Sequence, residues 1–282
     1  MTAFPDTNAF AALYPETPGT VRHNMADHPM FTLDSLVALA GRMQAKDVEY
    51  NRGDLPLGID FEAVPGNGLS IADTISGIEE NGSWMVLKFV EQDAGYRDLL
   101  AETLAELDAP IRAKTGAMLK QEAFIFISSP NSITPLHFDP EHNILLQLRG
   151  TKTMTVFPGN DEEIAPPRAH EHFYLGAGHR NLPWDDRYTP RGQRFDLAAG
   201  DGIYVPLMAP HWVQNGPEVS VSFSITWRSG YSYSEAEARG MNAMLRRTGV
   251  NPASPKRYPA RNLAKSTGFR AIRKARHILG RD

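Results

Sequence analysis

The sequence predicts a mainly β core, arranged as an antiparallel sandwich or a small barrel, with helical additions before and after it. Between about residues 121 and 230, short β-branched or aromatic runs alternate with polar residues and are separated by Gly, Pro and Asn. On both sides of this region, apolar residues recur at helical spacing instead. The short, closely spaced strands are typical of an antiparallel fold and not of βαβ units.

Length and composition are those of an ordinary globular chain. At 282 residues it is long for one domain and short for two, so we expect one large domain with additions. It contains no cysteine, which excludes disulfides, thiolate metal ligands and thiol nucleophiles. The N-terminus lacks the pattern of a secretory signal, and no segment approaches the apolar length of a membrane span. We therefore expect a cytoplasmic protein.

Residues 1–120 are predicted to be a mostly helical region that packs on the β core. Thr32 and Ser70 are side chains suited to cap helices, and each precedes apolar residues at helical spacing. A third run of apolar residues at helical spacing ends near Gly116. The predicted elements are helices over 31–43, from 71 onward and over 94–116, and an extended segment over 83–90.

Residues 121–230 are predicted to form the β core. Six alternating or β-rich runs indicate its strands, at 122–129, 143–150, 151–158, 201–206, 211–216 and 219–227. Residues 159–196 are rich in Pro, Gly, His and Arg and are too long for a hairpin loop. We expect them to be an insertion over one end of the core. Insertions of this length are often functional.

Residues 231–282 are predicted to be a basic helical region. Ser234 is suited to cap a first helix, and a Pro-rich linker leads to a last helix over 267–280 with Phe269, Ile272 and Ile278 on one stripe. Residues 239–282 hold 12 of the 29 Lys and Arg and one acidic residue, whereas residues 1–238 hold 17 basic and 32 acidic residues. This tail could bind nucleic acid, an anionic membrane surface or an acidic partner. Because no nucleic-acid-binding motif accompanies it, we expect it to pack on the acidic body or a second subunit.

The stretch TPLHFDPEHN, residues 134–143, contains the first candidate site residues. If it is a strand, His137 and Asp139 lie on one face and Phe138 on the other. With His211 from a later strand, they would form a two-histidine, one-carboxylate set, which suits Fe(II) and leaves coordination positions open. Taken alone, H-x-D has a simpler explanation, namely a surface histidine near an aspartate that shapes a turn.

Lys152 is the second unusual residue of the predicted core. It shares a strand face with Met154 and Val156. An ammonium group on such a face is costly to desolvate unless it meets an anion, and an anionic cosubstrate inside a barrel would supply one. The alternative is that Lys152 ends the strand and extends its ammonium into solvent.

Together these residues resemble the core of the JmjC and cupin-like Fe(II)/2-oxoglutarate oxygenases, especially their asparaginyl-hydroxylase-like branch. The similarity covers residues 120–230 well and the N-terminal region loosely. It consists of matches in type, order and spacing at Thr134, His137, Asp139, Asn143, Gln147, Gly150, Lys152 and His211.

The resemblance implies a fold, cofactors and an activity. The core would be a double-stranded β-helix. His137, Asp139 and His211 would bind Fe(II), Lys152 and Thr134 would hold the distal carboxylate of 2-oxoglutarate, and Asn143 would contact the cosubstrate or the groups around it. The protein would be a dioxygenase that hydroxylates a C–H bond, on a protein side chain or on a small molecule. A homodimer through the flanking helices is also implied.

Two other functions remain open from the residues alone. The first is a non-catalytic cupin-like regulatory module that binds a metal or a small acid. The second is a metal-dependent isomerase, or a dioxygenase without cosubstrate, for which Lys152 would be dispensable. A further histidine group in the insertion, His170, His172 and His179, could bind a second metal, but we expect exposed loop residues there. His142 has the wrong strand parity for a ligand.

Overall fold

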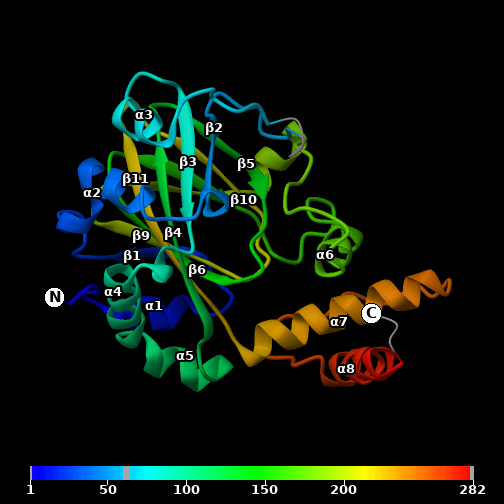
Figure 1. Cartoon of the computed structure of the whole chain (residues 1–282). Helices are drawn as coiled ribbons and strands as arrows, with labels where there is room; N and C mark the ends of the chain where they lie inside the picture. The colour runs from blue at the N-terminus through cyan, green and yellow to red at the C-terminus, as the bar shows by residue number, and fades with distance from the viewer. Residues whose placement is uncertain (1, 60–63, 280–282) are drawn as a thin grey trace.

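The computed structural model describes residues 2–59 and 64–279, which fold into two facing β-sheets with helices outside them (Figure 1). The larger sheet has the strand order β1-β9-β6-β11-β4-β3-β2, and the smaller one β5-β10-β7-β8. All strand pairs in both sheets are antiparallel. From β4 to β11 the chain passes back and forth between the sheets. This arrangement confirms the expected jelly-roll core with flanking helices.

The regular elements have the following bounds. The strands are β1 Gly19–Arg22, β2 Val48–Arg52, β3 Ser83–Lys88, β4 Leu119–Ser128, β5 Ile133–His137, β6 His142–Arg149, β7 Lys152–Val156, β8 Gln193–Leu197, β9 Asp201–Val205, β10 His211–Asn215 and β11 Ser220–Arg228. The helices are α1 Thr7–Leu13, α2 Leu33–Ala40, α3 Ile71–Ser76, α4 Ala94–Ala105, α5 Asp108–Thr115, α6 Pro167–Tyr174, α7 Gly230–Arg247 and α8 Leu263–Ile278.

The main apolar core lies between the larger sheet and the N-terminal helices. The alternation of β11 places Phe223, Ile225 and Trp227 on this outer face, fully buried. Trp227 packs against Phe10 and Tyr14, with ring centroids 6.2 and 5.9 Å away. Trp227 is therefore a core residue and does not line the site.

The opposite face of β11 is polar and looks into the space between the two sheets. Its Ser222 hydroxyl donates to Gln147 Oε1 at 2.7 Å, and its Ser224 hydroxyl donates to Asn143 Oδ1 at 2.8 Å. A second apolar cluster fills much of the remaining space, made of Leu145, Met154, Val156, Phe195, Leu197, Ile203, Val205, Ala209 and Val213. The polar wall of the barrel thus lies where the candidate site residues gather.

The N-terminal region follows the helical predictions in part. Thr32 and Ser70 cap α2 and α3 as expected, each accepting a backbone N–H. The helix predicted over 94–116 is instead two helices, α4 and α5. Pro110 explains the break, because its ring excludes the carbonyl four residues earlier in a continuous helix. The same region also supplies β1, β2 and β3 to the larger sheet.

The C-terminal region forms two helices, α7 and α8, which lie side by side and extend away from the barrel (Figure 1). The prediction that Ser234 caps the first helix is wrong, because α7 begins at Gly230 behind a capping box made by Ser229 and Ser232. Ser234 lies inside α7 and donates to a linker carbonyl. Of the predicted stripe on α8, Phe269 packs on α7, whereas Ile278 is 72% exposed.

The insertion contains α6 and a 3-10 turn over Asp186–Arg191, and it ends in β8. It lies at the edge of the smaller sheet, on the side of β5 (Figure 1). Within the described residues, no helix has the length and apolar character needed to cross a membrane.

Candidate metal centre

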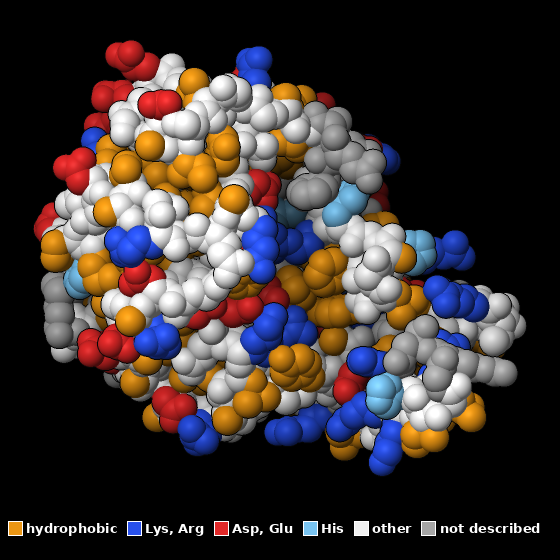
Figure 2. Space-filling view, viewed as in Figure 1, with side chains coloured by type: hydrophobic (Ala, Val, Ile, Leu, Met, Phe, Trp, Pro, Cys, Tyr) orange, Lys and Arg blue, Asp and Glu red, His pale blue; other side chains and the backbone are white. Residues whose placement is uncertain are grey.

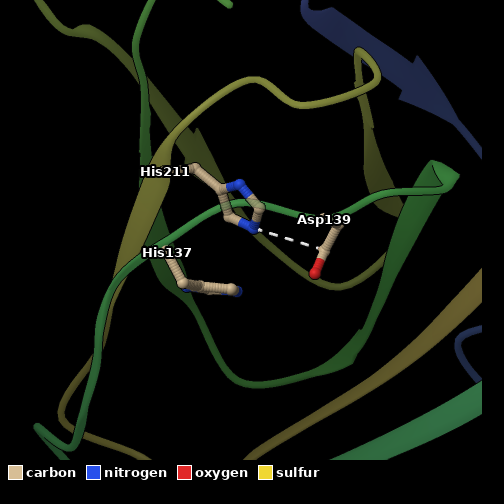
Figure 3. Close-up of side chains that lie close together, drawn as sticks. All are labelled: His137, Asp139 and His211. Atoms are coloured by element: carbon tan, nitrogen blue, oxygen red, sulfur yellow. Dashed lines mark ion pairs between the residues drawn. The ribbon is translucent and has the colours of Figure 1, made fainter. Parts of the chain in front are cut away.

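Three side chains predicted from the sequence converge in the structure. One ligand atom from each of His137, Asp139 and His211 lies within 4.8 Å of the other two, and Figure 3 shows the imidazoles and the carboxylate directed toward a common point. The two histidines are neighbours across the β5–β10 pair, with ring centroids 4.2 Å apart. Nε2 of His211 lies 3.6 Å from Oδ2 of Asp139. Among the described residues, this is the one cluster able to hold a metal.

The structure places Asp139 differently from the sequence argument, which assigned Asp139 to the same strand as His137. β5 ends at His137, so Asp139 is not on the strand but in the turn to β6. That turn is held in place because Asp139 O accepts a hydrogen bond from Met208 N at 2.9 Å. The alternation of strand residues thus predicted correctly that the side chains of His137 and Asp139 lie close together. The assumption that Asp139 belongs to the strand was incorrect.

The hydrogen bonds of the two imidazoles define their tautomers. Nδ1 of His137 lies 2.8 Å from the carbonyl oxygen of Pro135, and Nδ1 of His211 lies 3.0 Å from that of Ala209. A carbonyl only accepts, so each ring carries its hydrogen on Nδ1 and keeps a lone pair on Nε2. This is the state in which a histidine binds a metal, with its other nitrogen held by a backbone carbonyl. The residues present therefore fit a divalent metal.

The electrostatics of the cluster favour a charged Asp139 carboxylate beside a neutral His137 ring. Burial and the neighbouring His211 lower the pKa of His137, which keeps its ring neutral. Burial alone would raise the pKa of Asp139, but Arg180 and the two imidazoles outweigh this effect and lower it below its ordinary range. Asn143 adds a hydrogen bond from Nδ2 to Asp139 Oδ2 at 3.3 Å.

Arg180 is a site residue that sequence reasoning missed. Its Nη1 lies 2.6 Å from Oδ1 of Asp139, and its side chain is 48% exposed. It belongs to the insertion, 41 residues from its partner, where no periodic pattern or motif marked it. Only the folded insertion brings it to the cluster.

A pocket of about 460 Å³ opens beside the cluster. Figure 2 shows this hollow near the centre of the face, with basic, acidic and apolar side chains at its walls. Thr134 and Asn143 line it, as do the aromatic rings of Trp84, Phe124 and Phe126. A molecule in this pocket would lie directly beside His137 and Asp139, which also line it.

Lys152 is buried, as the family resemblance implies, but it does not line that pocket. It is 5% exposed, and burial lowers the pKa of its ammonium to about 7. Lys152 of β7 pairs with Asn215 of the neighbouring strand β10. Asn215 is four residues from His211 along β10, which corresponds to about 13 Å of strand. Lys152 and His211 share the strand face that looks into the barrel, because alternate residues of these strands are buried there. The Lys152 side chain thus lies inside the barrel, and its backbone is toward the end away from the cluster.

The other histidines do not form a second metal cluster among the described residues. His170 is buried in α6 and packs against the Phe138 ring, with centroids 4.5 Å apart, whereas the side chain of His172 is exposed. His142 is buried against Trp227 and lies 3.1 Å from the Ser229 hydroxyl, so it is a core histidine and not a ligand.

Comparison with protein families identifies this fold. The family model of the cupin-like domain matches residues 70–233, which include strands β3 to β11 and all three candidate ligands. The chain belongs to the cupin-like domain family. The family resemblance stated from the sequence is thereby confirmed.

Curated relatives of this cupin-like chain match only part of it. The lysine-specific demethylase JMJ31 of Arabidopsis thaliana is 26% identical over 114 residues, which are 38% of this chain and 21% of the relative. JmjC domain-containing protein D of Dictyostelium discoideum is 27% identical over 111 residues, which are 36% of this chain and 23% of the relative. The matches thus span less than a quarter of either relative.

Solved structures resemble nearly the whole cupin-like chain. The ribosomal oxygenase YcfD of Escherichia coli superposes with a TM-score of 0.54 and 15% identity, covering 96% of this chain and 68% of that chain. Its complex with cobalt and 2-oxoglutarate gives a TM-score of 0.51 and 16% identity, covering 97% and 67%. At these identities the likeness establishes the fold.

Proposed function

We propose that the protein is an Fe(II)- and 2-oxoglutarate-dependent oxygenase that hydroxylates a C–H bond. The observation that carries this proposal is the convergence of His137, Asp139 and His211, with both Nδ1 atoms held by carbonyls and one side open to the pocket. These three residues would hold the iron. Bound iron and its cosubstrate would supply the activation of dioxygen, and the protein would position the groups and exclude water.

The cosubstrate is proposed to lie between the metal and Lys152. Within the described part of the chain no carboxylate pairs with the Lys152 ammonium, so a dicarboxylate would supply the missing counter-charge. The Thr134 hydroxyl, in the wall of the pocket, would help to hold the distal carboxylate. Asn143, bonded to both Asp139 and Ser224, would keep the polar wall beside the cosubstrate in place.

A protein side chain is the proposed substrate class, with a small molecule as the alternative. The pocket combines aromatic rings with acidic and basic side chains, which suits a polypeptide segment better than a uniformly apolar ligand. The solved structures of similar fold are described as a ribosomal oxygenase, and a curated relative as a lysine-specific demethylase, which supports the same class. A cytoplasmic location and a homodimer remain predictions.

The test of this proposal is succinate formation. Purified protein with Fe(II), ascorbate and 2-oxoglutarate is expected to form succinate slowly without prime substrate, and the anaerobic iron form should develop a visible charge-transfer band as 2-oxoglutarate is added. Metal and 2-oxoglutarate binding without oxygen-dependent succinate would favour the non-catalytic regulatory module. Lack of 2-oxoglutarate binding by metal-loaded protein would contradict the proposal.

The pKa of Lys152 makes cosubstrate binding depend on pH. The ammonium of the free protein loses its proton near pH 7, whereas the complex with a dicarboxylate requires the charged form. Binding therefore takes up a proton above pH 7, and the Kd for 2-oxoglutarate is expected to rise by up to about tenfold per pH unit. Calorimetry in buffers of different ionisation enthalpy measures this proton uptake. A Kd that stays constant between about pH 6 and pH 9 would refute it.

A further inference from the structure

The insertion is joined to the metal-binding segment by backbone hydrogen bonds. The N–H of Phe138 donates to the carbonyl of Arg180 at 3.3 Å, and the N–H of Leu182 donates to that of Leu136 at 2.8 Å. Between these bonds, His137 and Asn181 form an antiparallel bridge. The insertion thus pairs with the free edge of β5, the strand that ends at His137.

Phe138 joins the same two segments through side-chain packing. It lies between two proposed ligands in sequence and is fully buried. Its ring meets His170 and Phe173 of α6 edge-on, with centroids 4.5 and 5.5 Å away. This contact explains the order of residues in H-F-D, because the middle residue attaches the segment to the insertion while its neighbours form the site.

Arg180 completes the connection at the carboxylate. It bonds Oδ1 of Asp139, whereas Oδ2 receives the Asn143 amide and lies nearest Nε2 of His211. The two oxygens therefore have different partners. Arg180 pairs with Oδ1, the oxygen that is farther from His211. The ion pair therefore does not obstruct a metal bound through Oδ2.

We propose that Arg180 is a positioning residue through which the insertion fixes Asp139 to bind metal with one oxygen, Oδ2. The guanidinium holds Oδ1 and so prevents rotation of the carboxylate into a two-oxygen mode. This keeps one more coordination position free for other ligands. The inference rests on the metal site of the proposed function, but not on the cosubstrate or on turnover.

Cobalt binding tests the proposal without any activity measurement. Arg180→Ala is expected to weaken Co(II) binding by about tenfold or more, in the range seen when a residue that orients a ligand is removed. It should also change the intensity of the Co(II) d–d absorption bands, because a second carboxylate oxygen can then enter the coordination sphere. Arg180→Lys, which keeps a cation, should restore part of the affinity.

Arg187→Ala is the matched control. Arg187 belongs to the same insertion and also forms an ion pair with an aspartate, Asp185, but both side chains are at the surface. Its cobalt affinity and spectrum should equal those of the wild type. Equal affinity and spectrum in Arg180→Ala would overturn the proposal, as would absence of cobalt binding in the wild type. If the wild-type protein binds cobalt but forms no succinate, only the proposed oxygenase activity is refuted. The cobalt affinities of the three variants would still decide the role of Arg180.

Discussion

Replacing His211 with alanine is expected to abolish specific binding of a divalent metal and all succinate formation. His211 is 2% exposed, and its Nδ1 is held by a carbonyl so that Nε2 faces Asp139. Without this ring two proposed ligands remain, and the affinity for Co(II) should fall by more than about 100-fold, beyond the loss typical of removing a residue that only orients a ligand. A spectroscopic titration with Co(II) and a succinate assay measure the two effects.

His172→Ala is the control for this prediction. It removes an exposed histidine of α6 that lies outside the three-residue cluster. Metal affinity and succinate formation should stay within about twofold of the wild type, as is usual for a surface substitution. Equal losses in both variants would place the metal elsewhere, and normal metal binding by His211→Ala would refute the proposed site.

Replacing Lys152 with methionine is expected to remove 2-oxoglutarate binding while the protein becomes no less stable. The variant leaves a cosubstrate carboxylate without its charged partner in a buried site, which should raise the Kd by about 100-fold or more. Burial lowers the pKa of the ammonium, so its charged form is disfavoured in the free protein. Methionine has similar length and no charge, and the free energy of unfolding should stay equal or rise by about 1 kcal/mol.

Three measurements separate binding from folding in Lys152→Met. Calorimetry with 2-oxoglutarate should show the loss, Co(II) titration should show normal metal affinity, and urea unfolding should show the unchanged or higher stability. Lys120→Met is the control, because that lysine, unlike Lys152, borders the large pocket, is 58% exposed and pairs with Glu122. A wild-type Kd for 2-oxoglutarate in Lys152→Met would contradict the proposed role of Lys152 as the partner of the cosubstrate carboxylate.

Sequence patterns predicted the elements whose residues carry a local signal. Thr32 and Ser70 indicated the starts of α2 and α3 because a capping side chain acts on backbone groups two or three residues away. The same logic failed at Ser234, since Ser229 offered an earlier cap that the folded chain uses. The helix over 94–116 was predicted as continuous because its apolar spacing outweighed the single proline that divides it.

The proposed ligands were predicted from spacing and resemblance, but the groups that orient them were not. Arg180 and Asp139 are 41 residues apart, and their contact depends on how the insertion folds back on β5. A sequence contains no local pattern for such a contact, because the energy that forms it comes from backbone pairing and from the packing of Phe138 on α6.

The sequence by itself determined the β core, its flanking helices and the residue types able to bind a metal, since alternation, capping and ligand chemistry are properties of neighbouring residues. The tertiary structure alone decided that Asp139 lies in a turn, that Arg180 holds one of its oxygens, and that Lys152 is buried away from the large pocket. Each of these depends on contacts between segments distant along the chain, and such contacts exist only when the two sheets and the insertion pack together.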